Sequence, residues 1–168
     1  MICVNVGSGQ RRFGTRQHPW VNVDVQPRWN PEIVADAAHL PMFEDGTVDL
    51  VVAHHILEHY GCGDGEGMIR EAHRILKPAG SFIVCVPDVW ELSSMWREGF
   101  LSDQVYMTNM YGAYMNDEAD RHKWGYTKKS LCLTLSVAFR QVRMFDWREI
   151  QGASIARDRW ILAMEGIK

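Results

Sequence analysis

The chain has 168 residues, with 18 Lys and Arg against 21 Asp and Glu and a formal net charge of −3. This length fits one domain with a single core, and the near balance of charge excludes the strongly basic surface that is typical of nucleic-acid-binding proteins. No run of about 18 apolar residues is present, so we expect no membrane-spanning helix. The first strand follows the amino terminus too closely for a signal segment, and the four cysteines are widely spaced. We therefore expect a cytoplasmic protein with free thiols.

Short apolar runs alternate with helix-length segments along the chain, a pattern typical of a mostly parallel sheet. The runs that predict strands are, in chain order, 2–6, 21–25, 32–35, 48–53, 81–86, 140–147 and 159–165. Helical periodicity predicts helices over 64–77 and 127–139. Only 11 residues separate Gly9 from Val21, so the first crossover helix must be shortened or replaced by a loop. We therefore predict an α/β fold, a three-layer sandwich of a seven-stranded, mostly parallel sheet with helices on both faces, in a single domain over 1–168.

Two glycines and an aspartate near the amino terminus form the pattern of a nucleoside site. The first apolar strand runs into Gly7-Ser8-Gly9, where bare backbone lets a ligand approach, and the second strand ends in Asp24, whose carboxylate suits a ribose diol. Arg12 stands where a dinucleotide-binding loop has its third glycine, and the sequence contains no phosphate-binding loop. The pattern therefore favours a nucleoside cofactor without phosphates.

A series of motifs in order resembles class I S-adenosylmethionine-dependent methyltransferases, in particular small members similar to the type 11 branch. The motifs occupy 4–9, 23–24, 36–43, 47–52, 54–59 and 71–80, with weaker similarity over 122–139. The resemblance implies a Rossmann-like sheet, S-adenosylmethionine as cofactor and S-adenosylhomocysteine as product. The function that it predicts is methyl transfer to an O, N or C nucleophile of a small molecule.

The resemblance also implies roles for individual residues. The cofactor-binding residues that it implies are Asn5, Gly7, Ser8, Gly9, Asp24, Val25, Asp36, Ala37, Ala38 and His54. Gly7 and Gly9 would lie against the methionine part, and Asp24 would bind the ribose hydroxyls. Asp36 and Ala37 would flank the adenine. Family members have Asp or Glu in place of Asn5, and a neutral amide lacks the charge that favours an ammonium group, so a module that binds the cofactor without catalysis is one alternative.

The histidines after the fourth strand allow a second alternative. Residues 55–59 fit the His-x-x-Glu-His pattern of inverted zinc peptidases, which would make the protein a zinc hydrolase that uses His55, Glu58 and His59, with Cys62 as a further zinc ligand. That chemistry requires a third ligand and a larger scaffold, so we predict no metal ligand. In a methyltransferase, His55 and His59 are the candidates for catalysis, because a neutral imidazole takes the proton of a hydroxyl or amine.

Residues 88–125 interrupt the alternation of strands and helices, and we expect them to form a lid or substrate-binding insertion. The aromatic and methionine residues that suggest this are Trp90, Trp96, Phe100, Tyr106, Tyr111, Tyr114, Met95, Met107, Met110 and Met115. They would suit a flat or apolar acceptor, or they pack a helical insertion onto the core. Residues 121–148 hold seven basic residues and one acidic residue, a balance of 7 − 1 = +6 that suits an anionic acceptor or a solvated surface. We expect no nucleic-acid or membrane partner.

Overall fold

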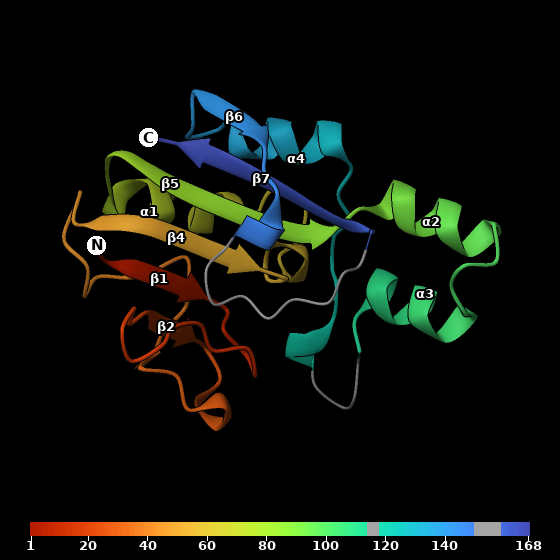
Figure 1. Ribbon diagram of the computed structural model, residues 1–168, viewed down its shortest axis with the longest axis horizontal. Coiled ribbons are helices and arrows are strands. Elements are labelled where there is room, and N and C mark those ends of the chain that lie inside the picture. Colours follow the sequence, from red (N-terminus) through yellow and green to blue (C-terminus); the bar gives the residue numbers. More distant parts are fainter. Residues whose placement is uncertain (114–117, 150–158) are drawn as a thin grey trace.

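The computed structural model describes residues 1–113, 118–149 and 159–168. Its strands are β1 (Cys3–Val6), β2 (Val21–Asp24), β3 (Ile33–Val34), β4 (Val48–His54), β5 (Leu76–Pro87), β6 (Gln141–Met144) and β7 (Ile161–Ile167). They form one sheet in the order β3-β2-β1-β4-β5-β7-β6 (Figure 1). The first five strands are parallel, and β7 runs antiparallel to both β5 and β6. The predicted α/β fold with a seven-stranded, mostly parallel sheet is therefore confirmed.

Two amphipathic helices cover one face of the sheet. They are α1 (Glu66–Ile75) and α4 (Lys128–Leu135), close to the predicted helices. Their buried residues join one core cluster with the strands and are Met68, Ile69, Ala72, Ile75, Leu131 and Leu135. A capping box between Thr127 and Ser130 fixes the start of α4. This face contains the larger part of the core, and burial of its apolar side chains is the main stabilising term.

The opposite face has a thinner cover in the described part of the chain. A second apolar cluster there joins Val52 and Ile83 of the sheet to Phe13 and Trp20 of the loop between β1 and β2. Trp147 of the 3-10 turn η4 (Trp147–Glu149) packs against the same cluster. The second helical layer is thus a single turn among the described residues. The reason is the short connection from β1 to β2, which contains no helix.

Two buried asparagines hold that loop in place. The Oδ1 atom of Asn22, a residue only 2% exposed, accepts hydrogen bonds from Phe13 N at 2.8 Å and from Asn5 Nδ2 at 2.9 Å. Asn22 Nδ2 donates to Phe13 O at 3.1 Å, and Asn5 Nδ2 donates to Arg11 O at 3.0 Å. These bonds satisfy loop backbone groups that no helix satisfies.

The segment that we expected to form a lid consists largely of helices. After β5, α2 (Val89–Arg97) and α3 (Asp103–Tyr111) lie beyond the carboxyl ends of the parallel strands (Figure 1). Trp96 stacks on Tyr106 with ring centroids 4.5 Å apart and so joins the two helices. The remaining 3-10 turns are η1 (Pro27–Trp29), η2 (Leu57–His59) and η3 (Glu118–Asp120). Tyr114 and Met115 lie outside the described residues. Among the helices described, none has the length and apolar character needed to cross a bilayer.

The asparagine network gives a stability prediction. In Asn22→Ala, Phe13 keeps its buried N–H and C=O but loses their partner, and the free energy of unfolding should fall by about 1–3 kcal/mol for each unpaired group. Urea denaturation measures the loss. Gln141→Ala, at an exposed position of β6, is the control and should change the value by no more than about 0.5 kcal/mol. Equal effects of the two substitutions would contradict a structural role for the network.

Candidate cofactor site

A cavity of about 320 Å³ opens at the carboxyl ends of β1, β2, β3 and β4. The strand order reverses between β1 and β4, which is where open α/β sheets bind ligands. The residues that line the cavity are Gly7, Gly9, Asp24, Val25, Gln26, Trp29, Ala35, Asp36, Ala37, His55, Ile56, His59, Tyr60, Gly61, Asp64, Ala119, Asp120 and Lys123. The structure therefore brings most of the predicted cofactor residues and both predicted catalytic histidines to one cavity.

The two glycines after β1 have different surroundings. Both have positive φ, +64° at Gly7 and +48° at Gly9, a backbone conformation that glycine adopts without strain. A Cβ atom on Gly7 would lie 2.5 Å from Ile56 Cδ1, whereas one on Gly9 would meet nothing within 4 Å. Gly7 therefore permits close packing, and Gly9 leaves open space that a ligand could fill.

The carboxylate of Asp24 connects this loop to the end of β2. Its Oδ2 atom accepts a hydrogen bond from Gly9 N at 2.7 Å, and its Oδ1 atom accepts one from Gln26 N at 2.8 Å. The residue is buried but lines the cavity. Each oxygen of an ionised carboxylate accepts more than one hydrogen bond, so both retain a lone pair for a ribose diol.

The loop that we predicted to flank the adenine follows Asp24 in the sequence, and α1 holds it in place. Asp36 Oδ1 accepts from Ala38 N at 2.9 Å and from the Tyr60 hydroxyl at 3.0 Å. Burial, followed by the nearby Asp36 charge, raises the pKa of Tyr60, so this hydroxyl stays a donor. Arg74 of α1 donates to the carbonyls of Leu40 and Phe43 and holds the end of the loop. Asp36 and Ala37 line the cavity, whereas Ala38 does not and packs partly against the core.

A second cavity of about 370 Å³ adjoins the first and shares Gly7, Gly9 and His55 with it. Its lining includes three more of the predicted cofactor residues, Asn5, Ser8 and His54, whereas Ala38 lines neither cavity. Ser8 Oγ and His54 Nε2 are buried and have no hydrogen-bond partner among the described residues. Unpaired buried polar atoms beside a cavity are available to a ligand or to water.

A buried carboxylate organises the histidines after β4. His55 has a positive φ of 55°, and its Nδ1 donates to Glu58 Oε1 at 2.9 Å. Glu58 is only 1% exposed. Burial alone would raise its pKa, but the bond from His55 and the charges of His55, His122 and His59 hold the pKa below its usual value. The structure therefore keeps an ionised carboxylate in the interior, with histidines around it.

The pattern of an inverted zinc peptidase is not reproduced. His55 lies outside the turn η2 that contains Glu58 and His59, and its Nδ1 is used by the carboxylate that would have to activate water. The set of ligand-type atoms that the structure brings together among the described residues is Glu58, His59 and His122. Sequence reasoning missed His122, because it follows α3 and only the fold places it beside η2.

Several other residues that line the cavity could not be predicted from the sequence. Trp29 of η1 and Tyr60 after η2 line the cavity, as do Asp120 and Lys123 of the segment after α3. Within the described residues, the aromatic and methionine residues of 88–125 line neither cavity. Besides Ala119, the described part of the segment presents polar residues to the site, which favours the alternative that its aromatic residues pack the insertion onto the rest of the protein.

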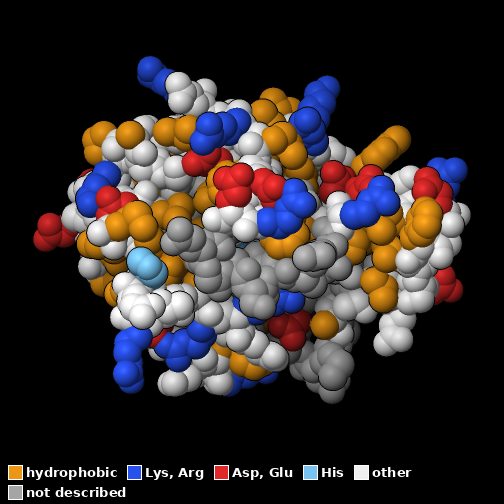
Figure 2. Space-filling model, viewed as in Figure 1, with side chains coloured by type: hydrophobic (Ala, Val, Ile, Leu, Met, Phe, Trp, Pro, Cys, Tyr) orange, Lys and Arg blue, Asp and Glu red, His pale blue; other side chains and the backbone are white. Residues whose placement is uncertain are grey.

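The basic segment 121–148 is not a concentrated cationic patch. Arg121 pairs with Glu118, Arg143 with Glu165 and Arg148 with Asp146. Figure 2 shows Lys and Arg side chains scattered among Asp and Glu over the face in view. The solvated surface is the interpretation that these contacts favour.

Comparisons with known proteins agree with this geometry. Residues 6–84, somewhat under half of the chain, match the family model described as "Methyltransferase domain". This part of the chain is therefore similar to class I methyltransferase domains. No curated protein is similar enough in sequence to count as a match.

Solved methyltransferase structures share the fold. A SAM-dependent methyltransferase of Thermotoga maritima has 17% identity and a TM-score of 0.63 over 99% of this chain and 82% of that one. One of Archaeoglobus fulgidus has 14% identity and a TM-score of 0.63, with 99% and 85% covered. The 1,6-didemethyltoxoflavin-N1-methyltransferase of Burkholderia thailandensis, solved with its substrate and S-adenosylhomocysteine, has 18% identity and a TM-score of 0.60, with 99% and 70% covered. Identities this low establish a shared fold, and the chain is distant from all three proteins in sequence.

The open space at Gly9 gives a binding prediction. Gly9→Ala should lower the affinity for S-adenosylmethionine about ten-fold or more, because the new methyl group enters the space next to Asp24. Gly63→Ala is the matched control, since Gly63 also has a positive φ, also has nothing within 4 Å of an added Cβ, and does not line the cavity. Both substitutions should cost about 1–2 kcal/mol of stability. Titration calorimetry showing equal affinity in the two variants would contradict ligand contact at Gly9.

The buried His54 predicts acid sensitivity. Burial, then the charges of His55 and Arg11, lowers its pKa from 6.5 to about 3. The unfolded chain therefore binds a proton that the folded protein excludes, so this contribution to stability is complete above about pH 6.5 and is lost as the pH falls toward 3.

Between pH 7 and pH 5, the wild type should lose about 2 kcal/mol more of its unfolding free energy than His54→Asn, measured by urea denaturation. The other histidines are present in both proteins, so the difference isolates His54. Parallel pH profiles would show that folding does not change the pKa of His54.

Proposed function

We propose that the protein transfers a methyl group from S-adenosylmethionine to a nucleophilic atom of a small molecule. The observation that carries this proposal is the position of Asp24, a buried carboxylate beside the open Gly9, in a cavity at the reversal of the strand order. The pair fits a ligand that presents a ribose diol and needs close approach to backbone.

The cavity residues fit the remaining parts of this cofactor. Asp36 and Ala37 would hold the adenine, on a loop that Arg74 fixes to α1. Ser8 and His54, with their unpaired buried atoms, would face the methionine part together with Asn5. The Asn5 amide nitrogen already donates to Arg11 O and to Asn22, so only its oxygen would accept from the ammonium group. When bound, the cofactor supplies a methyl group on a sulfonium, which is a good leaving group.

His55 is the residue that we assign to proton removal. It lines both cavities, and the bond from its Nδ1 to Glu58 leaves Nε2 as the ring atom that takes a proton from a hydroxyl or amine acceptor. Glu58 is a positioning residue in this scheme, because it fixes the tautomer and orientation of the imidazole. Alignment of acceptor and cofactor supplies most of the rate enhancement, up to about 7–11 kcal/mol, so the base improves the reaction without being obligatory.

The acceptor would enter beside the segment after α3. Asp120 and Lys123 line the first cavity, and Asn109 of α3 lines the second. We infer that residues 88–125, as far as they are described, form a substrate-binding insertion on this domain. Apart from Ala119, its described cavity-lining residues are polar, which favours an acceptor with hydroxyl, amine or charged groups.

The test of the proposed function is cofactor binding by titration calorimetry. The wild type should bind S-adenosylmethionine, and Asp24→Ala should reduce the affinity ten-fold or more, since it removes hydrogen bonds to a charged acceptor worth about 1.5–3 kcal/mol each.

Glu44→Ala is the control, because Glu44 is an exposed carboxylate that does not line the cavity. Asp24 also anchors Gly9 and Gln26, so thermal unfolding must show that the variant is folded. A folded Asp24→Ala protein with unchanged affinity would place the ribose elsewhere, and a wild type that binds neither S-adenosylmethionine nor S-adenosylhomocysteine would refute the proposal.

A further inference from the structure

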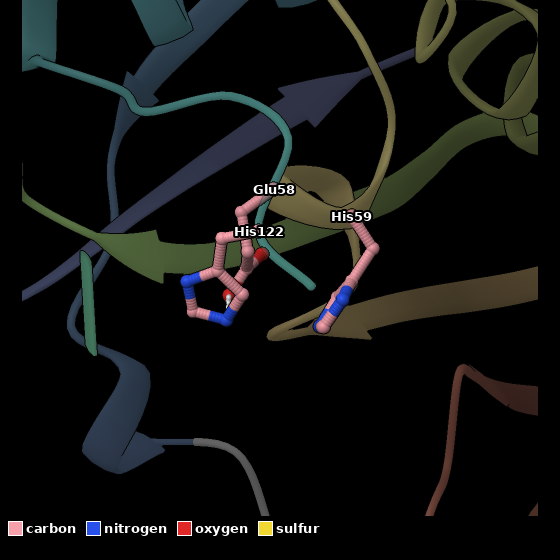
Figure 3. Close-up of side chains that lie close together, drawn as sticks. All are labelled: Glu58, His59 and His122. Atoms are coloured by element: carbon pink, nitrogen blue, oxygen red, sulfur yellow. Dashed lines mark ion pairs between the residues drawn. The ribbon is translucent and has the colours of Figure 1, made fainter. Parts of the chain in front are cut away.

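Three side chains from two distant parts of the chain converge beside the first cavity, and one of them, His59, lines it. Glu58 and His59 come from η2, and His122 comes from the segment after η3 (Figure 3). One nitrogen of each histidine and one carboxylate oxygen lie within 4.8 Å of one another. The two imidazoles meet edge to face, with ring centroids 4.8 Å apart.

The backbone fixes the tautomer of both histidines. His59 Nδ1 lies 3.2 Å from the carbonyl oxygen of Arg121, and His122 Nδ1 lies 2.9 Å from the carbonyl oxygen of Asn109. A carbonyl oxygen only accepts, so both Nδ1 atoms must carry the proton. In the neutral form of each ring the lone pair then lies on Nε2, and such a bond from the other ring nitrogen is the usual support of a histidine that binds a metal.

Glu58 is the third member of this cluster and brings a buried carboxylate close to these two nitrogens. Its Oε1 atom accepts from His55, but its Oε2 atom is buried and has no partner among the described residues. His122 Nε2 lies 4.0 Å from Oε1. At 4.0 Å the two atoms are too far apart for a direct hydrogen bond, and a cation, or a water that bridges them, fits between them.

We propose that Glu58, His59 and His122 bind a divalent transition-metal ion, with zinc as the best match. Two imidazoles and one carboxylate form a three-ligand set that zinc accepts, with a further position open to water or substrate. Zinc bound at about 2.0–2.2 Å places its ligand atoms about 3.4 Å apart in a tetrahedron. The imidazoles must therefore approach one another by side-chain rotation, which the partial exposure of His59 permits.

The role of this ion in methyl transfer rests on the proposed function, whereas the binding of the ion to the protein does not. His59 lines the first cavity, so the ion would stand at the cavity wall near Lys123 and Asp120. An open coordination position there would hold an oxygen or nitrogen of the acceptor and lower the pKa of a bound hydroxyl. The site thus points to an acceptor that chelates or ligates a metal through a hydroxyl, carboxylate or amine.

The test is zinc titration of protein first stripped with a chelator, followed by calorimetry and by the visible spectrum of the Co²⁺ derivative. We expect one ion per chain. His122→Ala and His59→Ala should each weaken binding by about 100-fold or more, because removal of even an outer-shell partner costs about 10–100-fold. His122→Asn is a second, polar variant that should also lose the ion, in case His122→Ala unfolds.

Two controls distinguish this site from adventitious binding. His18→Ala removes an exposed histidine outside the cluster, and Cys62→Ser removes the exposed thiol next to η2. Both should keep wild-type affinity for zinc and the same Co²⁺ spectrum. Zinc binding that is absent, that survives loss of His59 or His122, or that disappears in either control would overturn the proposal and leave water between the two acceptors.

Cofactor binding separates this inference from the proposed function. Calorimetry with S-adenosylmethionine in the presence of chelator should give the same affinity as without it, because Asp24 and Gly9 are not part of the cluster. A protein that binds the cofactor but not zinc refutes only the metal site. A protein that binds zinc but not the cofactor refutes only the methyltransferase proposal.

Discussion

The short connection between β1 and β2 is the constraint on which the cofactor site depends. Parallel neighbours are usually joined by a helix that satisfies its own backbone, and this loop has no such helix. Asn5 and Asn22 take over that task, since their buried amides bond to each other and to the backbone of Arg11 and Phe13. The loop is thereby fixed against the sheet, and Gly7 and Gly9 stand at a defined place beside Asp24. The same bonds require an amide at position 5, because a carboxylate has no hydrogen to donate to Arg11 O.

At the other side of the cavity, Glu58 also joins two parts of the chain. Its backbone carbonyl accepts from Lys123 N at 2.8 Å and from Trp124 N at 3.1 Å, while its side chain accepts from His55. One buried residue therefore connects the end of β4 to the segment that follows α3. A carboxylate in this position is costly to bury unless it is paired, so its surroundings must supply donors or cations. That requirement explains the concentration of histidines around it better than any single catalytic role does.

The composition of the insertion after β5 left two interpretations open, an apolar lining for the site or the packing of helices. Among the described residues Trp96 and Tyr106 stack on each other between α2 and α3, and Trp90 is 78% exposed. Composition cannot separate side chains that pack helices together from those that contact a ligand, because both uses favour large apolar groups. The polar residues Asp120 and Lys123, which do reach the cavity, look like ordinary surface residues in the sequence.

The sequence by itself determined the approximate positions of the strands along the chain, the two covering helices, the loop-like first crossover and the carboxylate at the end of β2. These depend on local periodicity, glycine and proline positions and connection length, all of which are short-range properties. Only the tertiary structure decided that Asn5 serves the loop, that His55 is bonded to Glu58 and that His122 completes the cluster at η2. Such contacts join residues far apart in the chain, and their geometry follows from how the strands and the insertion pack, which no local pattern encodes.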